Sequence, residues 1–210
     1  LSPTYVSAWI DQMGIENSFN QSNNYNRPSY SSTSINNLPG VTFSPTYSEH
    51  LYYTSDNLES VKMFTTNKTN FTLYVVGKAD TRSGDNSTFF SQTAGNATAF
   101  ALERISNGKF AVKVNDSDVI NVNGLDGLNL HAIEYNGTSL NYRLNKILVG
   151  SSNSMGYKSA TGDSFFIGRQ NNNGYLSGEI KEVMVFNRDL TETEMTYVEN
   201  YLYDKWFRTR

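Results

Sequence analysis

Short segments in which apolar and polar residues alternate recur along the chain, separated by residues typical of turns. An alternation with a period of two is the pattern of a β-strand with one buried face. The dipeptides Asn107-Gly108 and Asn136-Gly137 each join two such segments, and Asn-Gly favours the tight type I′ turn of a hairpin. A third tight turn is expected at residues 115–118. Three consecutive hairpins predict an antiparallel meander in the middle of the chain.

The same pattern predicts about a dozen strands over the whole chain. They are Tyr5–Ile10, Gly40–Ser44, Leu51–Thr54, Phe71–Lys78, Phe89–Gln92, Ala97–Ser106, Lys109–Asn115, Val119–Asn123, Leu130–Tyr135, Leu140–Val149, Ser164–Arg169 and Gly178–Phe186. So many twisted strands usually split into two packed sheets. We see no repeat and no long linker in the 210 residues, so one domain is expected over residues 1–210. The predicted fold class is all-β: an antiparallel two-sheet jelly-roll sandwich with one C-terminal α-helix.

The last predicted strand, Gly178–Phe186, is apolar on both faces. Strict alternation groups its apolar residues as Ile180, Met184 and Phe186 on one face and Val183 and Val185 on the other. A strand that is apolar on both faces indicates that something covers each side of the sheet.

An amphipathic helix is expected directly after this strand. Thr191 and Glu194 have the spacing of a capping box, and Leu190 and Met195 have that of a hydrophobic staple. The apolar residues that follow at helical spacing are Met195, Val198, Leu202 and Trp206. One stripe of this helix can therefore dock on a sheet.

Composition and charge exclude several classes of function. The net charge of −3 and the pI of about 5.4 argue against a nucleic-acid partner, because phosphate binding needs clustered Lys and Arg. No apolar run approaches the roughly 20 residues that a membrane span needs, so no direct insertion into a membrane is expected. Cysteine is absent, which excludes disulfides, thiolate metal sites and cysteine nucleophiles.

Two interpretations of the cellular location follow from the surface. The chain opens without the basic and apolar regions of a signal peptide, as a cytoplasmic protein would. Only 18% of the residues are charged, whereas Asn, Ser, Thr and Tyr are abundant, as on exposed bacterial or phage surface domains. We favour the second interpretation: one module of a larger exported protein, located extracellularly on a cell surface or a pilus.

Several segments carry a resemblance to a known family. In the N-terminal part the matching residues are Trp9, Asp11, Gln21, Arg27, Pro28, Asn37, Val41 and Phe43, and the segments FTLYVVGKAD and SFFIGRQNNNGYLSGEIKEVMVFNRDL continue the likeness. Over nearly its entire length the chain resembles the concanavalin A-like (laminin G-like) jelly-roll domains of bacterial surface adhesins and modular pilins. The resemblance implies binding of a sugar or a protein, often assisted by calcium. The expected partner is a glycan or a host surface glycoprotein.

Catalysis is not expected. Enzymes with the fold that this resemblance implies use carboxylates spaced Glu-x-Asp-x-Glu on one face of a strand. The nearest candidates are Glu179 and Glu182, which differ by three positions and so are expected on opposite faces. His50 and His131 have no Ser or Asp partner at a recognisable spacing, which favours structural roles for both.

A calcium site is the one cofactor that the residues suggest. Calcium prefers carboxylate, amide and carbonyl oxygens, and the loop that contains Asp80, Asp85 and Asn86 offers all three. The alternative is a polar hairpin loop without metal. Asp116 and Asp118 are a weaker second choice, because Asp is simply a common turn residue.

Candidate ligand-binding residues come from arginines and from two polar loops. Arg104, Arg143 and Arg169 interrupt otherwise apolar strands, where an arginine can make forked hydrogen bonds to sugar hydroxyls or carboxylates. The alternative is a cross-strand ion pair with Glu103 or Glu134.

The loop after Arg169 adds further candidates. The amides of Gln170 and Asn172 can donate hydrogen bonds to hydroxyl groups and accept them, and the ring of Tyr175 can stack on a pyranose. Arg82, in the loop with the predicted calcium ligands, completes the set. The alternative is that residues 170–175 form a long hairpin loop with no role in binding.

The sequence therefore predicts a non-catalytic, lectin-like adhesion module. The first alternative is a protein-binding adhesin module, which would expose an aromatic patch. The second is a structural pilus or phage component on the same scaffold, which would oligomerise and have no pocket.

Overall fold

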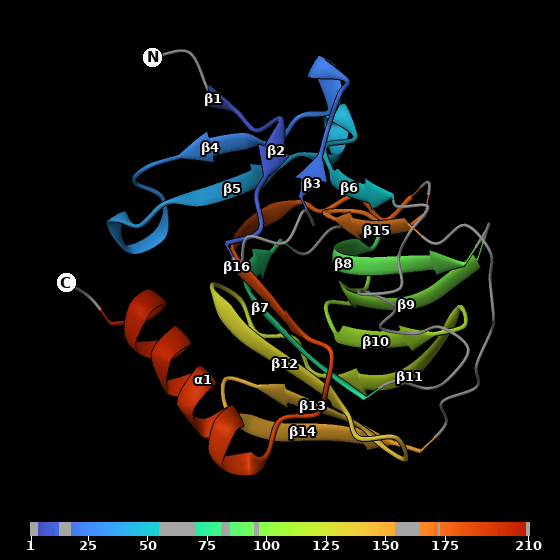
Figure 1. Cartoon of the computed structure of the whole chain (residues 1–210). Coiled ribbons are helices and arrows are strands. Elements are labelled where there is room, and N and C mark those ends of the chain that lie inside the picture. Colours follow the sequence, from blue (N-terminus) through green and yellow to red (C-terminus); the bar gives the residue numbers. More distant parts are fainter. Residues whose placement is uncertain are drawn as a thin grey trace.

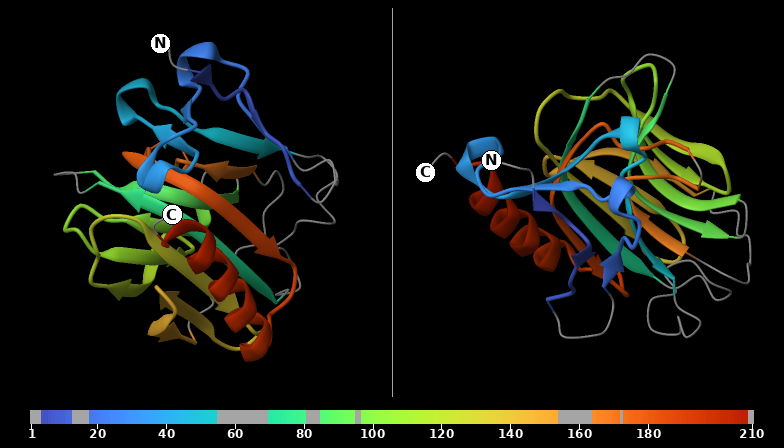
Figure 2. Two further views of the ribbon diagram at one scale, coloured as in Figure 1. Left: turned by 90° about the vertical axis from the view of Figure 1, so that its left-hand side faces the viewer. Right: turned by 90° about the horizontal axis from the view of Figure 1, so that it is seen from above.

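A computed structural model describes residues 4–12, 18–54, 70–80, 85–94, 97–153, 164–171 and 173–208. In it, two antiparallel eight-stranded sheets pack against each other, and one C-terminal helix covers the outer face of one of them (Figures 1 and 2). This arrangement confirms the predicted antiparallel β-sandwich with a single C-terminal α-helix. The prediction that residues 1–210 form one domain stays a prediction.

Sheet A contains strands from both ends of the chain. In spatial order it consists of β1 (Thr4–Tyr5), β4 (Ser29–Ser31), β5 (Gly40–Phe43), β16 (Gly178–Phe186), β7 (Phe71–Ala79), β12 (Asn129–Tyr135), β13 (Leu140–Leu144) and β14 (Ile147–Ser152). The C-terminal strand β16 pairs with β5 on one side and with β7 on the other. It therefore joins the N-terminal strands to the rest of the sheet.

Sheet B holds the meander. In spatial order it consists of β11 (Ser117–Val122), β10 (Phe110–Val114), β9 (Ala97–Arg104), β8 (Ser87–Ala94), β15 (Ser164–Ile167), β6 (Leu51–Thr54), β3 (Phe19–Asn20) and β2 (Ala8–Trp9). Three 3₁₀ turns lie in the N-terminal part, at Asn24–Asn26, Ile35–Asn37 and Pro45–Tyr47. The predicted hairpins from β9 to β11 and from β12 to β13 are confirmed.

The turn types differ from the prediction. Gly108 and Gly137 have positive φ values of 82° and 93°, but the Asn before each does not, so neither is a type I′ turn. In the first of them Ile105 bonds Lys109 across a three-residue loop, in which the glycine takes the left-handed position. The length of the loop therefore accounts for the type of this first turn.

Predicted strand boundaries were wrong in two places. The expected strand Leu140–Val149 is a hairpin, because Asn145 and Lys146 have positive φ values of 50° and 74° and turn the chain between β13 and β14. The expected strand Tyr5–Ile10 is split into β1 and β2, which belong to different sheets. The short strands β3 and β4 gave no recognisable alternation.

The core lies between the sheets and is rich in aromatic side chains. Phe71, Phe89, Phe100, Phe110 and Phe165 are all fully buried there. A buried histidine lies among these rings: His131 contacts the Phe89 and Phe110 rings at 4.8 Å between centroids, and its Nδ1 lies 2.7 Å from Tyr142 Oη. Many of the chain's aromatic residues thus fill the interior between the two sheets.

A β-bulge at Lys181 changes which residues share a face of β16. Ile180 pairs with Gly77 and Glu182 pairs with Val76, so one residue of β16 has no partner on β7. Ile180 consequently packs into the core with Val183, whereas Met184 and Phe186 pack under the helix. The predicted grouping of Ile180 with Met184 and Phe186 was therefore wrong, although both faces are apolar as expected.

Helix α1 (Glu192–Trp206) begins with the predicted capping box. The Thr191 side chain accepts a hydrogen bond from the Glu194 backbone N–H, and the Glu194 carboxylate accepts one from the Thr191 N–H. The buried residues of the second core cluster come from β7, β12 and the helix segment: Tyr74, Val76, Leu130, Ala132, Leu190, Met195, Leu202 and Trp206. The helix therefore docks on sheet A through the predicted stripe. No helix in the described part of the chain is long and apolar enough to cross a membrane.

The helix contact can be tested with a pair of variants. Leu202 is fully buried against sheet A, whereas 71% of Tyr197 on the same helix is exposed. Replacing Leu202→Ala should lower the free energy of unfolding by about 2–5 kcal/mol, because it leaves a cavity at the helix–sheet contact. Tyr197→Ala should change it by less than about 0.5 kcal/mol. Urea unfolding at neutral pH measures both, and equal losses would contradict this packing.

Candidate ligand-binding site

One row of side chains crosses the outer face of sheet B. The strand registers place Tyr52, Phe166, Ser91, Ala101 and Lys113 opposite one another on successive strands. Their neighbours on either side in sequence, such as Phe165 and Leu102, enter the core instead. The row is thus aromatic at one end, small in the middle and charged at the other end.

The aromatic end of this row surrounds an arginine. The guanidinium carbon of Arg169 lies 4.1 Å from the centroid of the Phe166 ring, within the range of a cation–π contact. One of its terminal nitrogens lies 3.2 Å from Nε2 of His50. The His50 ring in turn lies about 6 Å from the rings of Tyr52 and Tyr175. We refer to these five residues as the aromatic–arginine cluster.

The loop after β15 holds Arg169 in place. Gly168 has a φ of 87°, and a Cβ on it would lie 2.5 Å from the Phe43 ring, so only glycine fits. Ser91 Oγ donates a hydrogen bond to the Arg169 carbonyl at 2.7 Å. The backbone of Arg169 is therefore fixed to the adjacent strand before its side chain reaches the surface.

His50 in this cluster is a neutral acceptor. Its Nδ1 lies 2.8 Å from the carbonyl of Ser48, which can only accept, so Nδ1 carries the proton. Nε2 is left to accept from Arg169 and from the Gln21 amide, each at 3.2 Å. Burial and the nearby Arg169 lower the pKa of His50 to about 4, although the Ser48 hydrogen bond raises it. At neutral pH the ring therefore presents a lone pair to the guanidinium.

Arg169 has no acidic partner within ion-pair distance in the described residues. Arg104, Arg143 and Arg188, by contrast, pair with Asp126, Glu199 and Glu194 at 2.8 Å. Burial lowers the pKa of Arg169, and interactions with the Tyr175 and Tyr52 side chains offset part of that effect. Its Nε–H is buried and has no hydrogen-bond partner among the described residues, although the guanidinium hydrogen-bonds the Tyr175 side chain. The cluster thus contains a half-buried cation whose charge no carboxylate of the described chain balances.

The structure separates the other predicted ligand residues. Gln170 is buried and donates to Thr98 Oγ1 at 2.8 Å, so it follows Arg169 in sequence but faces inward. Arg104 donates to the Ala79 carbonyl and to Asp126, at 2.8 Å each, in a structural contact. Neither Glu103 nor Glu134 is its partner. Arg82 and Asn172 lie outside the described residues.

The predicted calcium ligands do not converge in the described part of the chain. Asp80 pairs with Lys78 at 2.8 Å. The Asn86 oxygen accepts from the Ser106 N–H, and its amide nitrogen donates to Glu103. No group of three acidic or histidine side chains suited to a metal occurs among the described residues. Asp85 is exposed, and residues 81–84 are outside the description, so calcium in this loop remains a prediction.

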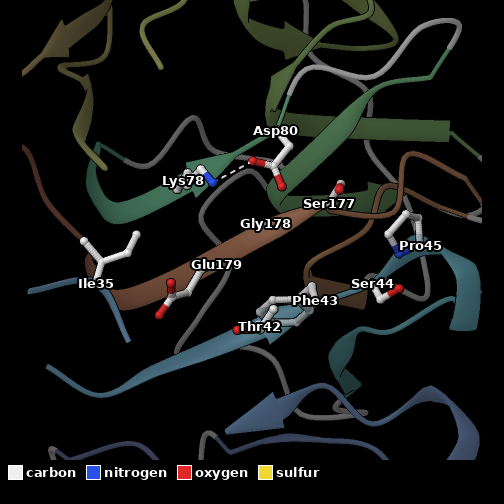
Figure 3. Close-up of a pocket in the computed structure, with 10 residues that line it drawn as sticks. All are labelled: Ile35, Thr42, Phe43, Ser44, Pro45, Lys78, Asp80, Ser177, Gly178 and Glu179. Carbon is white, nitrogen blue, oxygen red and sulfur yellow. Dashed lines mark ion pairs between the residues drawn. The ribbon is translucent and has the colours of Figure 1, made fainter. Parts of the chain in front are cut away.

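Asp80 lines a pocket of about 230 Å³ on the outer side of sheet A (Figure 3). The residues around it are Ile35, Thr42, Phe43, Ser44, Pro45, Lys78, Asp80, Ser177, Gly178 and Glu179. Its charges are already paired: Lys78 with Asp80, and Glu179 with the bulge residue Lys181 at 2.6 Å. Because these groups neutralise one another, the pocket is a weaker candidate than the aromatic–arginine cluster.

The prediction that Glu179 and Glu182 point to opposite faces was wrong. The bulge at Lys181 places both on the face that carries the helix, opposite Lys78 and Val76. Glu182 there contacts Lys205 and the Trp206 indole, and Glu179 contacts Lys181 and Ser34. Glu182 therefore connects β16 to helix α1, and Glu179 connects it to Ser34 in the N-terminal part.

Sequence reasoning identified Arg169 and Tyr175 but missed the rest of the cluster. His50, Tyr52 and Phe166 reach it only through the pairing of β6 with β15. The available signal was the run of aromatic residues in both segments, which reads equally well as core.

Comparison with known proteins places the chain in a family. It belongs to the concanavalin A-like lectin/glucanases superfamily, whose family model matches residues 52–196. No curated protein matches the sequence.

Solved structures share the fold at low sequence identity. Trypanosoma rangeli sialidase in complex with sialic acid matches with a TM-score of 0.63 and 14% identity, over 99% of this chain and 32% of the sialidase. The binding domain of botulinum neurotoxin DC in complex with rat synaptotagmin II gives 0.56 and 13%, over 73% of this chain and 40% of that domain. The CBM40 domain of Ruminococcus gnavus IT-sialidase bound to α2,3-sialyllactose gives 0.50 and 16%, over 62% and 82%. The chain spans less than half of the sialidase and neurotoxin structures.

The His50 pKa gives a prediction about stability. An unfolded histidine titrates near pH 6.5 and the folded one near 4, so its stabilising contribution is complete above pH 6.5 and is lost as the pH falls toward 4. The loss should be about 3 kcal/mol between pH 7 and pH 4. His50→Gln cannot titrate, so the difference in unfolding free energy between the native protein and this variant should shrink by that amount. A difference that stays constant with pH would show that His50 is not held neutral.

Proposed function

We propose that this chain is a non-catalytic carbohydrate-binding module of an exported bacterial surface or pilus protein. The observation that carries the proposal is the aromatic–arginine cluster: a half-buried guanidinium beside two half-buried tyrosines on the outer face of a lectin-type sheet. Arginine donors bond sugar oxygens, and tyrosine rings stack on the apolar face of a pyranose.

The family and the structural neighbours support this choice of ligand class. Lectins form part of the superfamily to which the chain belongs. One neighbour is a carbohydrate-binding domain with sialyllactose bound, and another is a toxin binding domain solved with a sialylated ligand. These likenesses concern the fold, so the proposal depends on the cluster itself.

The absence of catalysis is also part of the proposal. Most glycosidases need two carboxyl groups that flank the glycosidic bond, whereas sialidases, one of which shares the fold, use a tyrosine as the nucleophile. The buried Glu103 pairs at 3.0 Å with Lys113, which lies at the charged end of the row on sheet B, away from the cluster. Glu179 and Glu182 lie on the other sheet. The proposed cluster contains no carboxylate that could act as acid, base or nucleophile.

A second candidate function is protein binding, and one observation favours it. Strand β14 is the edge of sheet A, and its Ile147 and Leu148 are 67% and 55% exposed. Tyr197, Tyr201 and Tyr203 are exposed on the helix. An apolar edge strand can pair with an extended segment of another protein.

A glycan array distinguishes the two candidates. The native chain should bind a subset of glycans, and Tyr175→Ala should weaken that binding about fivefold to tenfold, because a stacking ring contributes about 1 kcal/mol. Tyr197→Ala, far from the cluster, serves as the control and should bind normally.

Chelator in a parallel array tests the predicted calcium ion separately. Binding that needs calcium would involve the loop with Asp80, Asp85 and Asn86, whereas chelator-resistant binding would leave the cluster as the determinant. No signal on the array, together with binding to a host surface protein that Leu148→Lys abolishes, would reject the carbohydrate proposal in favour of the second candidate.

A further inference from the structure

We infer that the aromatic–arginine cluster selects a sugar that carries a carboxylate, with Arg169 as its anchor and His50 as the residue that positions Arg169. This inference rests on the proposed carbohydrate-binding function and specifies the ligand class of the same site. A neutral sugar could also bond a guanidinium, so charge is what distinguishes an acidic sugar at this site.

The guanidinium of Arg169 lies in an aromatic, partly buried environment. One face of the Arg169 side chain is covered by Phe166, and its surroundings are aromatic rings, an imidazole and phenols. Taking a cation partly out of water without a counterion is unfavourable. A ligand that supplies a carboxylate restores the missing partner, and an arginine fork matches a carboxylate in geometry. A neutral sugar leaves the charge unbalanced.

Other charged groups around the cluster do not remove this imbalance. Glu49, next to His50 in sequence, points its carboxylate at the Ser44 N–H at 2.7 Å. Arg27, another cation, donates to the backbone carbonyl of Gln21, whose side chain contacts His50. Among the described residues, the other titratable side chains in contact are the Tyr52 and Tyr175 phenols, and neither supplies a carboxylate. No carboxylate of the described residues therefore pairs with the Arg169 guanidinium, and an acidic ligand would supply one.

His50 acts through Arg169 rather than on the ligand. The Ser48 carbonyl fixes the imidazole tautomer, and Nε2 then accepts from one terminal nitrogen of Arg169. The guanidinium thus contacts His50 and also hydrogen-bonds the Tyr175 side chain, while its Nε–H is buried. The arrangement limits the rotation of the side chain and orients its remaining donors. Protonation of His50 would replace the accepting lone pair with a positive N–H and would expel the guanidinium from this position.

Titration calorimetry with three probes tests the ligand class. The probes are α2,3-sialyllactose, a disaccharide that ends in glucuronic acid, and lactose as the neutral control. One or both acidic probes should bind at least tenfold more tightly than lactose, and the acidic probe that does so identifies the source of the carboxylate. Arg169→Gln should remove this preference, whereas Arg188→Gln, an exposed arginine paired with Glu194 far from the cluster, should retain it.

The pH dependence tests the role of His50. Affinity of the native protein for the preferred acidic probe should fall about fourfold between pH 6 and pH 3.5, since a group with a pKa near 4 becomes mostly protonated over that range. His50→Gln should bind more weakly at pH 6 and should change by less than about twofold over the same range. Far-UV circular dichroism at each pH confirms that the protein stays folded.

Each outcome is decisive. Equal affinity for lactose and for both acidic probes would overturn the carboxylate inference and leave the carbohydrate-binding proposal standing. Binding of no glycan, here and on the array, would overturn both. An unchanged pH profile in His50→Gln would remove the positioning role of His50 alone.

Discussion

Strand β16 is the contact on which the rest of the structure depends. It lies in the middle of sheet A although it comes near the end of the chain, and it pairs with β5 from the N-terminal part and with β7 (Figure 1). Its two faces serve two separate apolar clusters, the interior between the sheets and the layer beneath helix α1. Long-range antiparallel pairing of this kind is slow to form and cooperative once formed. The sandwich and its helix are therefore coupled through one strand.

The candidate site depends on pairing between strands that lie far apart in the sequence. Neighbouring strands of sheet B bring together side chains that are more than a hundred residues apart in sequence, such as His50 and Arg169. The inward-facing residues of those strands belong to the packed core, so their outward-facing partners have fixed positions. The sheet thus presents Arg169, whose charge no described carboxylate balances, beside aromatic rings that would suit a sugar. Pre-organisation of this sort lowers the entropy cost of binding.

Much of the fold was predictable from the sequence, and the reasons are local. Alternation and Asn-Gly turns give strands and hairpins, and the capping box with its apolar stripe gives the helix. The errors also have local causes. Asn145 and Lys146 carry no obvious turn signal, yet both adopt left-handed backbone, and the bulge at Lys181 leaves no mark in the alternation.

The site was only partly predictable for a different reason. Arg169 and Tyr175 stand out in the sequence because an arginine precedes an amide-rich segment and a tyrosine follows it. His50, Tyr52 and Phe166 become neighbours of that loop only through strand pairing between distant segments, which composition and spacing do not encode. Arg104 illustrates the converse: it looked like a ligand residue, and its position at the end of β9 gives it Asp126 as a structural partner.

The extra residue at Lys181 has a consequence for how related chains should be compared. Before Lys181, even-numbered residues of β16 face the core, whereas after it odd-numbered residues do. A homologue without the extra residue needs a one-residue gap at that position of the alignment. Without the gap, the residues aligned with Val183 and Met184 would be assigned to the wrong faces of the sheet. Sequence alignments that forbid gaps inside strands would misassign every column from there to the helix.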